Sequence, residues 1–284
     1  RSWNLLDWAP IDQPNDGVVT HQNMFFVRAL RSTAELAEWS GCGGSEELLA
    51  RADALKEAIN AHLWSEERQA YVDCIHADGR VSDIFSMQTQ VVAHLCEIPQ
   101  GERLERIASY LVQPPAGFVQ IGSPFMSFFY YESLAKMGRI DLLLADLRAN
   151  YGTMIEHDAT TCWEMYPKPL SRRSHPNVLT RSHCHAWSAA PGYFLGACVL
   201  GVRGADPGWS KVLVEPQTAN LSWARGTVPL PGGGRIDVAW RVEANSNRIF
   251  IRAEAPSSVE LAIKAPEGYE AVIEQVALET IGRI

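Results

Sequence analysis

Two hydrophobic patterns divide this sequence into two parts. Between about residues 20 and 200, apolar residues recur at intervals of three and four, the spacing that places side chains on one face of a helix. After Gly204 they alternate with polar residues, as in RIDVAWRV (235–242), which is typical of strands with one buried face. We therefore predict a chain that is mainly α with a β domain: a helical domain at residues 1–204 and a small antiparallel β-sandwich at residues 205–284.

About seven helices are predicted in the first domain. A first helix ends at the glycine-rich residues 41–44, and a second begins at Ser45. Ser123 is placed to cap the start of a later helix and Gly138 to close its end. Asp141 is expected to cap the helix after that. The apolar stripes of the first two helices are Phe26, Ala29, Leu30, Ala34 and Ala37, and Leu48, Leu49, Ala52, Leu55, Ile59 and Leu63.

The helical part is expected to close with the apolar segment 186–200, which ends at Gly201. Beyond it, RIFIRAEA and SVELAIKA alternate in the same way as residues 235–242, and VLVEP and LSWARGTV are predicted as two shorter strands. The glycines at 232–234 supply a turn between strands.

Composition and charge exclude several classes of protein. Of the 284 residues, 46% are hydrophobic and 20% charged, which is typical of a globular protein and not of a disordered one. A net charge of −8 without a basic run argues against nucleic acid or an anionic membrane as partner. No apolar stretch approaches the roughly 18 to 20 residues of a membrane span. The six cysteines form no CxxC pair and are expected to be reduced, which favours the cytoplasm.

The long connection at residues 151–182 is the predicted place for chemistry, because long loops in compact helical domains are often functional. Two dense stretches, MIEHDATTCWEMY (154–166) and RSHCHAWSAAPGYF (181–194), combine carboxylates, imidazoles and indoles. Such a mixture suits a sugar, since aromatic faces cover its apolar C–H patches while acids and imidazoles bind hydroxyls or transfer protons. The candidate residues are Glu156, His157, Asp158, Trp163, Glu164, His183, His185 and Trp187.

Other chemistries fit this region less well. A zinc site could be formed by Cys162, His183, Cys184 and His185, which are ligands of the right type. Their spacing matches no standard zinc motif, and the adjacent residues Cys184 and His185 cannot easily face one ion. A cysteine nucleophile activated by a histidine is disfavoured, because neither cysteine of this region lies in a recognisable nucleophile motif. The glycines at 232–234 are not followed by Lys-Ser/Thr, so a hairpin is expected there rather than a phosphate loop. No cofactor is predicted, and no metal pattern such as an EF-hand is seen.

Five segments of the sequence form an ordered set: LLDW (5–8), SMQTQVVAHLCEI (86–98), GSPFMSFFYYESLAKMG (122–138), ATTCWE (159–164) and RSHCHAWSAAP (181–191). Together they resemble the catalytic region of bacterial α-L-rhamnosidases. WSKVLVEPQ also resembles the opening of that family's sheet domain. The resemblance implies a six-hairpin (α/α)6-toroid glycoside hydrolase, present here as a partial toroid of about seven helices. It also implies inverting hydrolysis of terminal α-L-rhamnosides, with rhamnose-containing glycosides or polysaccharides as substrates.

The same resemblance assigns roles to individual residues. Glu164, in the ATT-x-WE motif, matches the glutamate that activates water as general base. His185 matches a histidine that contacts the sugar. The other candidate substrate-binding residues are Trp163 and Trp187, which resemble pocket walls, and Asp7 and Trp8, which resemble a pair at the rim of the same cavity.

One part of the family's machinery has no match in this sequence. The general acid of these enzymes lies in an acidic, arginine-containing motif upstream of the segment that resembles residues 5–8. We therefore expect the C-terminal part of a longer enzyme, inactive alone and completed by its missing N-terminal part. Two alternatives stay open: a non-catalytic carbohydrate-binding fragment, and another toroid enzyme such as a uronide hydrolase or a polysaccharide lyase. For a lyase, the cations that neutralise the uronate would be Arg172, Arg173 and Arg181.

Overall fold

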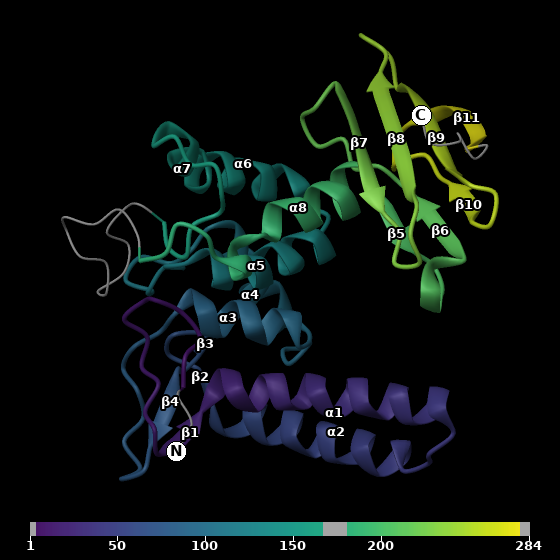
Figure 1. Cartoon of the computed structure of the whole chain (residues 1–284). Coiled ribbons are helices and arrows are strands. Elements are labelled where there is room, and N and C mark those ends of the chain that lie inside the picture. Colours follow the sequence, from purple (N-terminus) through teal and green to yellow (C-terminus); the bar gives the residue numbers. More distant parts are fainter. Residues whose placement is uncertain (1–3, 167–180, 279–284) are drawn as a thin grey trace. The chain divides into compact units, whose positions relative to one another are not determined.

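The computed structural model describes residues 4–166 and 181–278 and divides the chain into two compact units (Figure 1). Helices make up most of the first unit and strands most of the second, as the two hydrophobic patterns predict. The first unit comprises Arg1–Met137 with Asp146–Ser188, and the second comprises Gly138–Ala145 with Ala189–Ile284.

The first unit is built around a helical hairpin and a buried central helix. Helices α1 and α2 lie antiparallel, and α3 packs against α1, α4 and α5 (Figure 1). Two short antiparallel ribbons, β1 with β4 and β2 with β3, complete it. The prediction of about seven helices is confirmed. The bounds are α1 Thr20–Ser40, α2 Ser45–His62, α3 Met87–Leu95, α4 Glu102–Val112, α5 Pro124–Lys136, α7 Gly152–Glu156, β1 Gly17–Val19, β2 Trp64–Ser65, β3 Ala70–Tyr71 and β4 Cys74–His76. The boundary between the two units falls within α6, Ile140–Asn150.

Helix α1 buries only part of the predicted stripe, in which Leu30 and Ala34 are buried. Met24 and Val27 are fully buried, in phase with Leu30, whereas Phe26 of the predicted stripe is 49% exposed. Ala29 is exposed as well. The error arises because α1 carries apolar residues on more than one face, so spacing alone does not select the face that meets the core.

Helix α3 has all nine of its residues buried, so its polar side chains need partners inside the protein. The Ser86 hydroxyl accepts a hydrogen bond from the Thr89 amide at 3.3 Å and so caps the helix. Gln90 exchanges two hydrogen bonds with the backbone of Tyr71, at 3.0 and 2.9 Å. Gln88 donates to Asp7 at 2.7 Å. Buried amides thus join α3 to the strand β3 and to the N-terminal segment.

The predicted helix ends are confirmed at α5 and shifted at α6. The Ser123 hydroxyl accepts from the Met126 amide at 3.5 Å, and Gly138 follows α5 with φ of 69°. Asp141 lies inside the first turn of α6 rather than before it, because the helix already begins at Ile140. Its carboxylate accepts two hydrogen bonds from Arg139, at 2.8 and 2.7 Å.

The second unit holds two sheets with strand orders β10-β6-β5 and β11-β9-β8-β7. The predicted alternation is confirmed, since Ile236, Val238 and Trp240 of β8 are buried and the intervening residues are not. Before the sheets, the apolar segment 186–200 forms three short helical pieces and ends at Gly201, with φ of 77°. The first of these pieces, η1 Ala186–Ser188, still belongs to the first unit. The bounds in the second unit are α8 Ala190–Phe194, η2 Leu195–Val199, β5 Val202–Gly204, η3 Pro207–Trp209, β6 Lys211–Val214, β7 Trp223–Pro229, β8 Arg235–Val242, β9 Arg248–Pro256, β10 Glu260–Ile263 and β11 Glu270–Leu278.

The sheets are mixed rather than purely antiparallel. Strand β10 pairs parallel with β6, and β11 pairs parallel with β9. After β9 the chain passes to the other sheet and back again, so these two strands reach their neighbours through crossovers instead of hairpin turns. Among the described residues, no helix has both the length and the apolar character needed to cross a membrane.

Candidate functional site

Two segments of the first unit run side by side and hold Glu164. The Glu164 amide donates to the Ser182 carbonyl at 2.9 Å, and the His185 amide donates to the Cys162 carbonyl at 3.0 Å. The Trp187 indole N–H donates to the Glu164 carbonyl at 3.0 Å. The backbone of Glu164 is thus bound at both its N–H and its C=O, which fixes the point from which its side chain extends.

The carboxylate of Glu164 lies beside one of the three candidate imidazoles, that of His185. Glu164 is only 9% exposed, and its Oε2 is 3.9 Å from Nδ1 of His185, which is partly open to solvent. A separation of this size is too long for a direct hydrogen bond, but one water or hydroxyl oxygen can bridge it. The second imidazole, His183, instead stacks on Trp163, with 4.6 Å between ring centroids.

Aromatic side chains gather next to this pair. The Trp187 ring lies 4.3 Å from His185 and 5.2 Å from Phe125 at the start of α5. The edge of Trp8 meets Trp187 with 6.4 Å between centroids, and the Arg181 guanidinium lies 4.9 Å above the Trp8 ring. The structure therefore brings Trp8, His185 and Trp187 together, although more than 170 residues separate the first from the other two in the sequence.

Trp163 is placed differently from Trp187. It is only 4% exposed, and the Ser188 hydroxyl donates to its carbonyl at 2.6 Å. Its ring contacts His183 and lies 6.3 Å from His157. Trp163 thus belongs to a small aromatic cluster with two histidines, while the ring of Trp187 meets Trp8 and Phe125.

Asp7 anchors the N-terminal segment beside these aromatic side chains. Its Oδ1 accepts hydrogen bonds from the Trp8 amide and the Ser123 hydroxyl, and its Oδ2 accepts from the Gln88 amide group and the Gly122 backbone N–H. Burial raises the pKa of the Asp7 carboxyl, although all four hydrogen bonds act against this. A side chain at Gly122 would lie 2.5 Å from the Trp8 carbonyl oxygen, so only glycine permits this close approach.

Comparison with protein families decides what this arrangement belongs to. The model of the bacterial alpha-L-rhamnosidase 6 hairpin glycosidase domain matches residues 1–199. This chain belongs to the bacterial α-L-rhamnosidase family. The model of the same family's C-terminal domain matches residues 201–278. The resemblance inferred from the sequence motifs is thereby confirmed, as is the partial six-hairpin fold followed by a β domain.

Known rhamnosidases are similar to this chain over most of its length. An α-L-rhamnosidase of Alteromonas sp. (strain LOR) is 25% identical over 228 residues, which are 78% of this chain and 22% of that protein. The crystal structure of a GH78 family rhamnosidase of Bacillus sp. GL1 is 58% identical, covers 98% of this chain and 29% of its own, and has a TM-score of 0.92. A rhamnosidase from Klebsiella oxytoca with rhamnose bound is 25% identical, covers 66% of this chain and 35% of its own, and has a TM-score of 0.54.

This chain thus spans 22% and 29% of the length of the first two relatives.

One cavity of its first unit, of about 210 Å³, is lined by Tyr166, Tyr130 and Ser127 among others, but not by Glu164 or the tryptophans of the site. The Ser127 and Tyr166 hydroxyls lie 2.7 Å apart at its wall. The predicted roles of Trp163 and Trp187 as pocket walls therefore stay predictions.

The alternatives from the sequence have mixed outcomes. In the described part of the rhamnosidase-family chain, a cluster of three possible metal ligands occurs at Asp12, Cys74 and His76 and not at the zinc ligands considered above, Cys162, His183, Cys184 and His185. Arg181 contacts Trp8, whereas Arg172 and Arg173 lie outside the described residues. Sequence reasoning missed Phe125, whose only signal is its place two residues after the capping Ser123.

Proposed function

We propose that this chain is part of a glycoside hydrolase that removes terminal α-L-rhamnosyl groups with inversion, and that Glu164 is its general base. One observation carries the proposal: the Glu164 carboxylate is almost buried, held through its backbone, and 3.9 Å from the partly exposed imidazole of His185. The names of the relatives support the substrate class, since they are rhamnosidases and one has rhamnose bound.

In this mechanism Glu164 accepts a proton from water while the water oxygen attacks the anomeric carbon. The bond from that carbon to the leaving oxygen breaks, and a carboxylic acid on the opposite face protonates the leaving oxygen. Inverting glycosidases keep their two carboxyl groups about 6.5 to 9.5 Å apart so that the water fits between them. We assign this acid to the N-terminal part of the same enzyme, outside residues 1–284.

Of the remaining predicted residues, three contact the sugar in this proposal, and the other two, Asp7 and Trp163, hold the segments around them in place. His185 binds a hydroxyl group near the attacked carbon, and Trp8 and Trp187 cover apolar C–H surface. Asp7 acts through its hydrogen bonds, which fix the backbone at Trp8. Trp163 orients the loop through its stacking on His183. The substrates are rhamnose-containing glycosides or polysaccharides.

We also propose the domain division at residue 204. In this division residues 1–204 form the incomplete catalytic toroid and residues 205–284 the C-terminal β domain. The two family models meet close to this point, one ending at residue 199 and the other beginning at residue 201.

An assay of the intact enzyme on an aryl α-L-rhamnoside tests the proposed function. We expect release of rhamnose whose first-formed anomer, followed by NMR, is β, while the matched aryl β-L-rhamnoside is not cleaved. A first-formed α anomer would contradict inversion. Binding of rhamnose without release would favour a carbohydrate-binding protein, and an ultraviolet-absorbing unsaturated product from a uronide would favour a lyase.

A further inference from the structure

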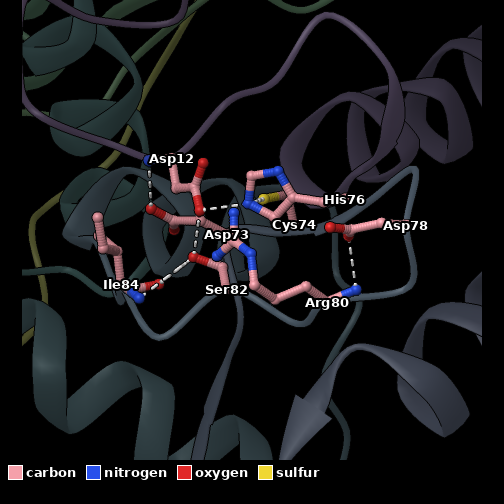
Figure 2. Close-up of polar contacts among 8 residues, drawn as sticks. All are labelled: Asp12, Asp73, Cys74, His76, Asp78, Arg80, Ser82 and Ile84. Carbon is pink, nitrogen blue, oxygen red and sulfur yellow. Dashed lines mark hydrogen bonds and ion pairs between the residues drawn. The ribbon is translucent and has the colours of Figure 1, made fainter.

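A cluster of mixed donor atoms lies in the first unit, away from Glu164. Cys74 and His76 are two residues apart on β4, so their side chains point to the same side of the strand. Asp12, in the segment between Trp8 and β1, brings its carboxylate to them (Figure 2). Strand β1 pairs with β4, with Val19 opposite Cys74. The cluster thus joins the N-terminal segment to the β4 ribbon.

The three donor atoms are close enough to share one ion. His76 Nε2 is 2.9 Å from Asp12 Oδ2 and 3.6 Å from Cys74 Sγ, and all three atoms lie within 4.8 Å of one another. Cys74 is fully buried, while the side chains of Asp12 and His76 are 17% and 18% exposed. Within residues 4–166 and 181–278, no other group of three such ligands comes this close.

A second layer of hydrogen bonds orients the carboxylate of Asp12. The Ser82 hydroxyl donates to Asp12 Oδ2 at 2.8 Å, and the Asp12 amide donates to Asp73 Oδ2 at 3.2 Å (Figure 2). Asp73 is held in turn by the hydroxyls of Ser86 and Thr89, at 2.6 and 2.7 Å. In metal sites, outer hydrogen bonds of this kind fix the orientation of the ligand side chains.

We propose that Asp12, Cys74 and His76 form a zinc site. A thiolate, an imidazole and a carboxylate are the three ligand types that zinc takes in proteins, whereas calcium and magnesium require oxygen ligands. Zn–S and Zn–N bonds of about 2.3 and 2.0 to 2.1 Å at tetrahedral angles place S and N about 3.6 Å apart. Sγ of Cys74 and Nε2 of His76 already have this separation, 3.6 Å.

The carboxylate has to move slightly for a tetrahedral site. The same bond lengths place the oxygen and nitrogen ligands about 3.3 Å apart, so Asp12 Oδ2 must withdraw from His76 by a few tenths of an ångström. A water molecule takes the fourth position. The ion joins residues 64 positions apart in the sequence and so fastens the segment that carries Asp7 and Trp8 to β4.

The protonation of the ligands gives the site a measurable signature. Burial and, to a smaller extent, the neighbouring Asp12 carboxylate raise the pKa of the Cys74 thiol to about 12. Zinc binds the thiolate, so the S–H bond breaks, a Zn–S bond forms and one proton passes to the buffer. His76 binds through Nε2 as the neutral imidazole.

Titration of the chelator-treated full chain with zinc tests the site. We expect one high-affinity zinc per chain, release of about one proton, measured as the buffer dependence of the binding enthalpy, and a thiolate-to-metal charge-transfer band when Co²⁺ replaces Zn²⁺. Cys74→Ser is expected to weaken zinc binding at least tenfold and to remove the band. The matched control is Cys96→Ser, because Cys96 is also a buried free thiol whose pKa burial raises to about 12.

Two results with cysteine variants would overturn the proposal, and a third result, with His76→Gln, would do the same. One is equal zinc affinity in Cys74→Ser and the unchanged chain; the other is loss of zinc binding in Cys184→Ser, which would place the ion at the exposed loop cysteine. His76→Gln provides a second variant, and its circular dichroism is compared with that of the unchanged chain so that lost binding is separated from unfolding. In a folded His76→Gln chain, unchanged zinc affinity would also contradict the site.

Discussion

Replacing Glu164 with glutamine in the intact enzyme should lower kcat on an aryl α-L-rhamnoside by a factor of about 10² to 10⁴, the range for loss of a general base. Glutamine keeps the size of the side chain and leaves both backbone hydrogen bonds of residue 164 in place, but it cannot accept the proton of the attacking water. Steady-state release of the aryl alcohol measures the effect.

The matched control is Glu156→Gln. Glu156 lies at the end of α7 in the same stretch of sequence and is exposed, so the same chemical change there should leave kcat within a factor of about two. If Glu164→Gln keeps turnover close to that of the control, Glu164 is not the base.

A second large effect is expected from separating the chain from the rest of its enzyme. Residues 1–284 alone should show no detectable rhamnoside hydrolysis, because we assign the proton donor to the missing N-terminal part. Mixing or coexpressing the chain with that part should restore release of rhamnose from the aryl α-L-rhamnoside.

The control for this complementation is the same mixture made with Glu164→Gln in the chain, which should stay inactive. Comparing the two mixtures distinguishes reconstitution of the active site from activity of the N-terminal part on its own. Full turnover by residues 1–284 alone would contradict the assignment of the acid.

The fold follows from the sequence where one local pattern dominates. Ser123 and Gly138 bound α5 as predicted, because capping and left-handed termination are local properties of the chain. The alternation of residues 235–242 coincides with β8. The buried face of α1 was predicted only in part, because Leu30 and Ala34 are buried but Phe26 is not. The apolar residues of α1 lie on several sides, and tertiary packing determines which of them meet the core.

Strand pairing depends on contacts that no local pattern contains. The strand β11 was missed because residues 270–278 mix apolar and charged positions without clean alternation. Strand β11 pairs parallel with β9, and β10 pairs parallel with β6, because the chain crosses from one sheet to the other before each of these strands. Antiparallel pairing was the natural expectation from short turns, and it fails where the chain changes sheets.

The candidate site was predictable in its members but not in its arrangement. Motif resemblance selected Glu164, His185 and Trp187, and the structure places these three next to one another. Which imidazole faces the carboxylate was not predictable, since His183 and His185 are equivalent in spacing arguments. The proposed zinc ligands escaped notice because Asp12 is 64 residues from His76 and C-x-H alone is a weak signal.

The most direct test of the central claim is chemical rescue of Glu164→Ala by azide in the intact enzyme. Azide is already an anion and needs no base, and it can occupy the space left by the carboxylate and its water. We predict that azide raises the turnover of Glu164→Ala at least tenfold, forms β-L-rhamnosyl azide, and does nothing for Glu156→Ala. No acceleration by azide, or an α-configured product, would contradict the role of Glu164 as general base of an inverting rhamnosidase.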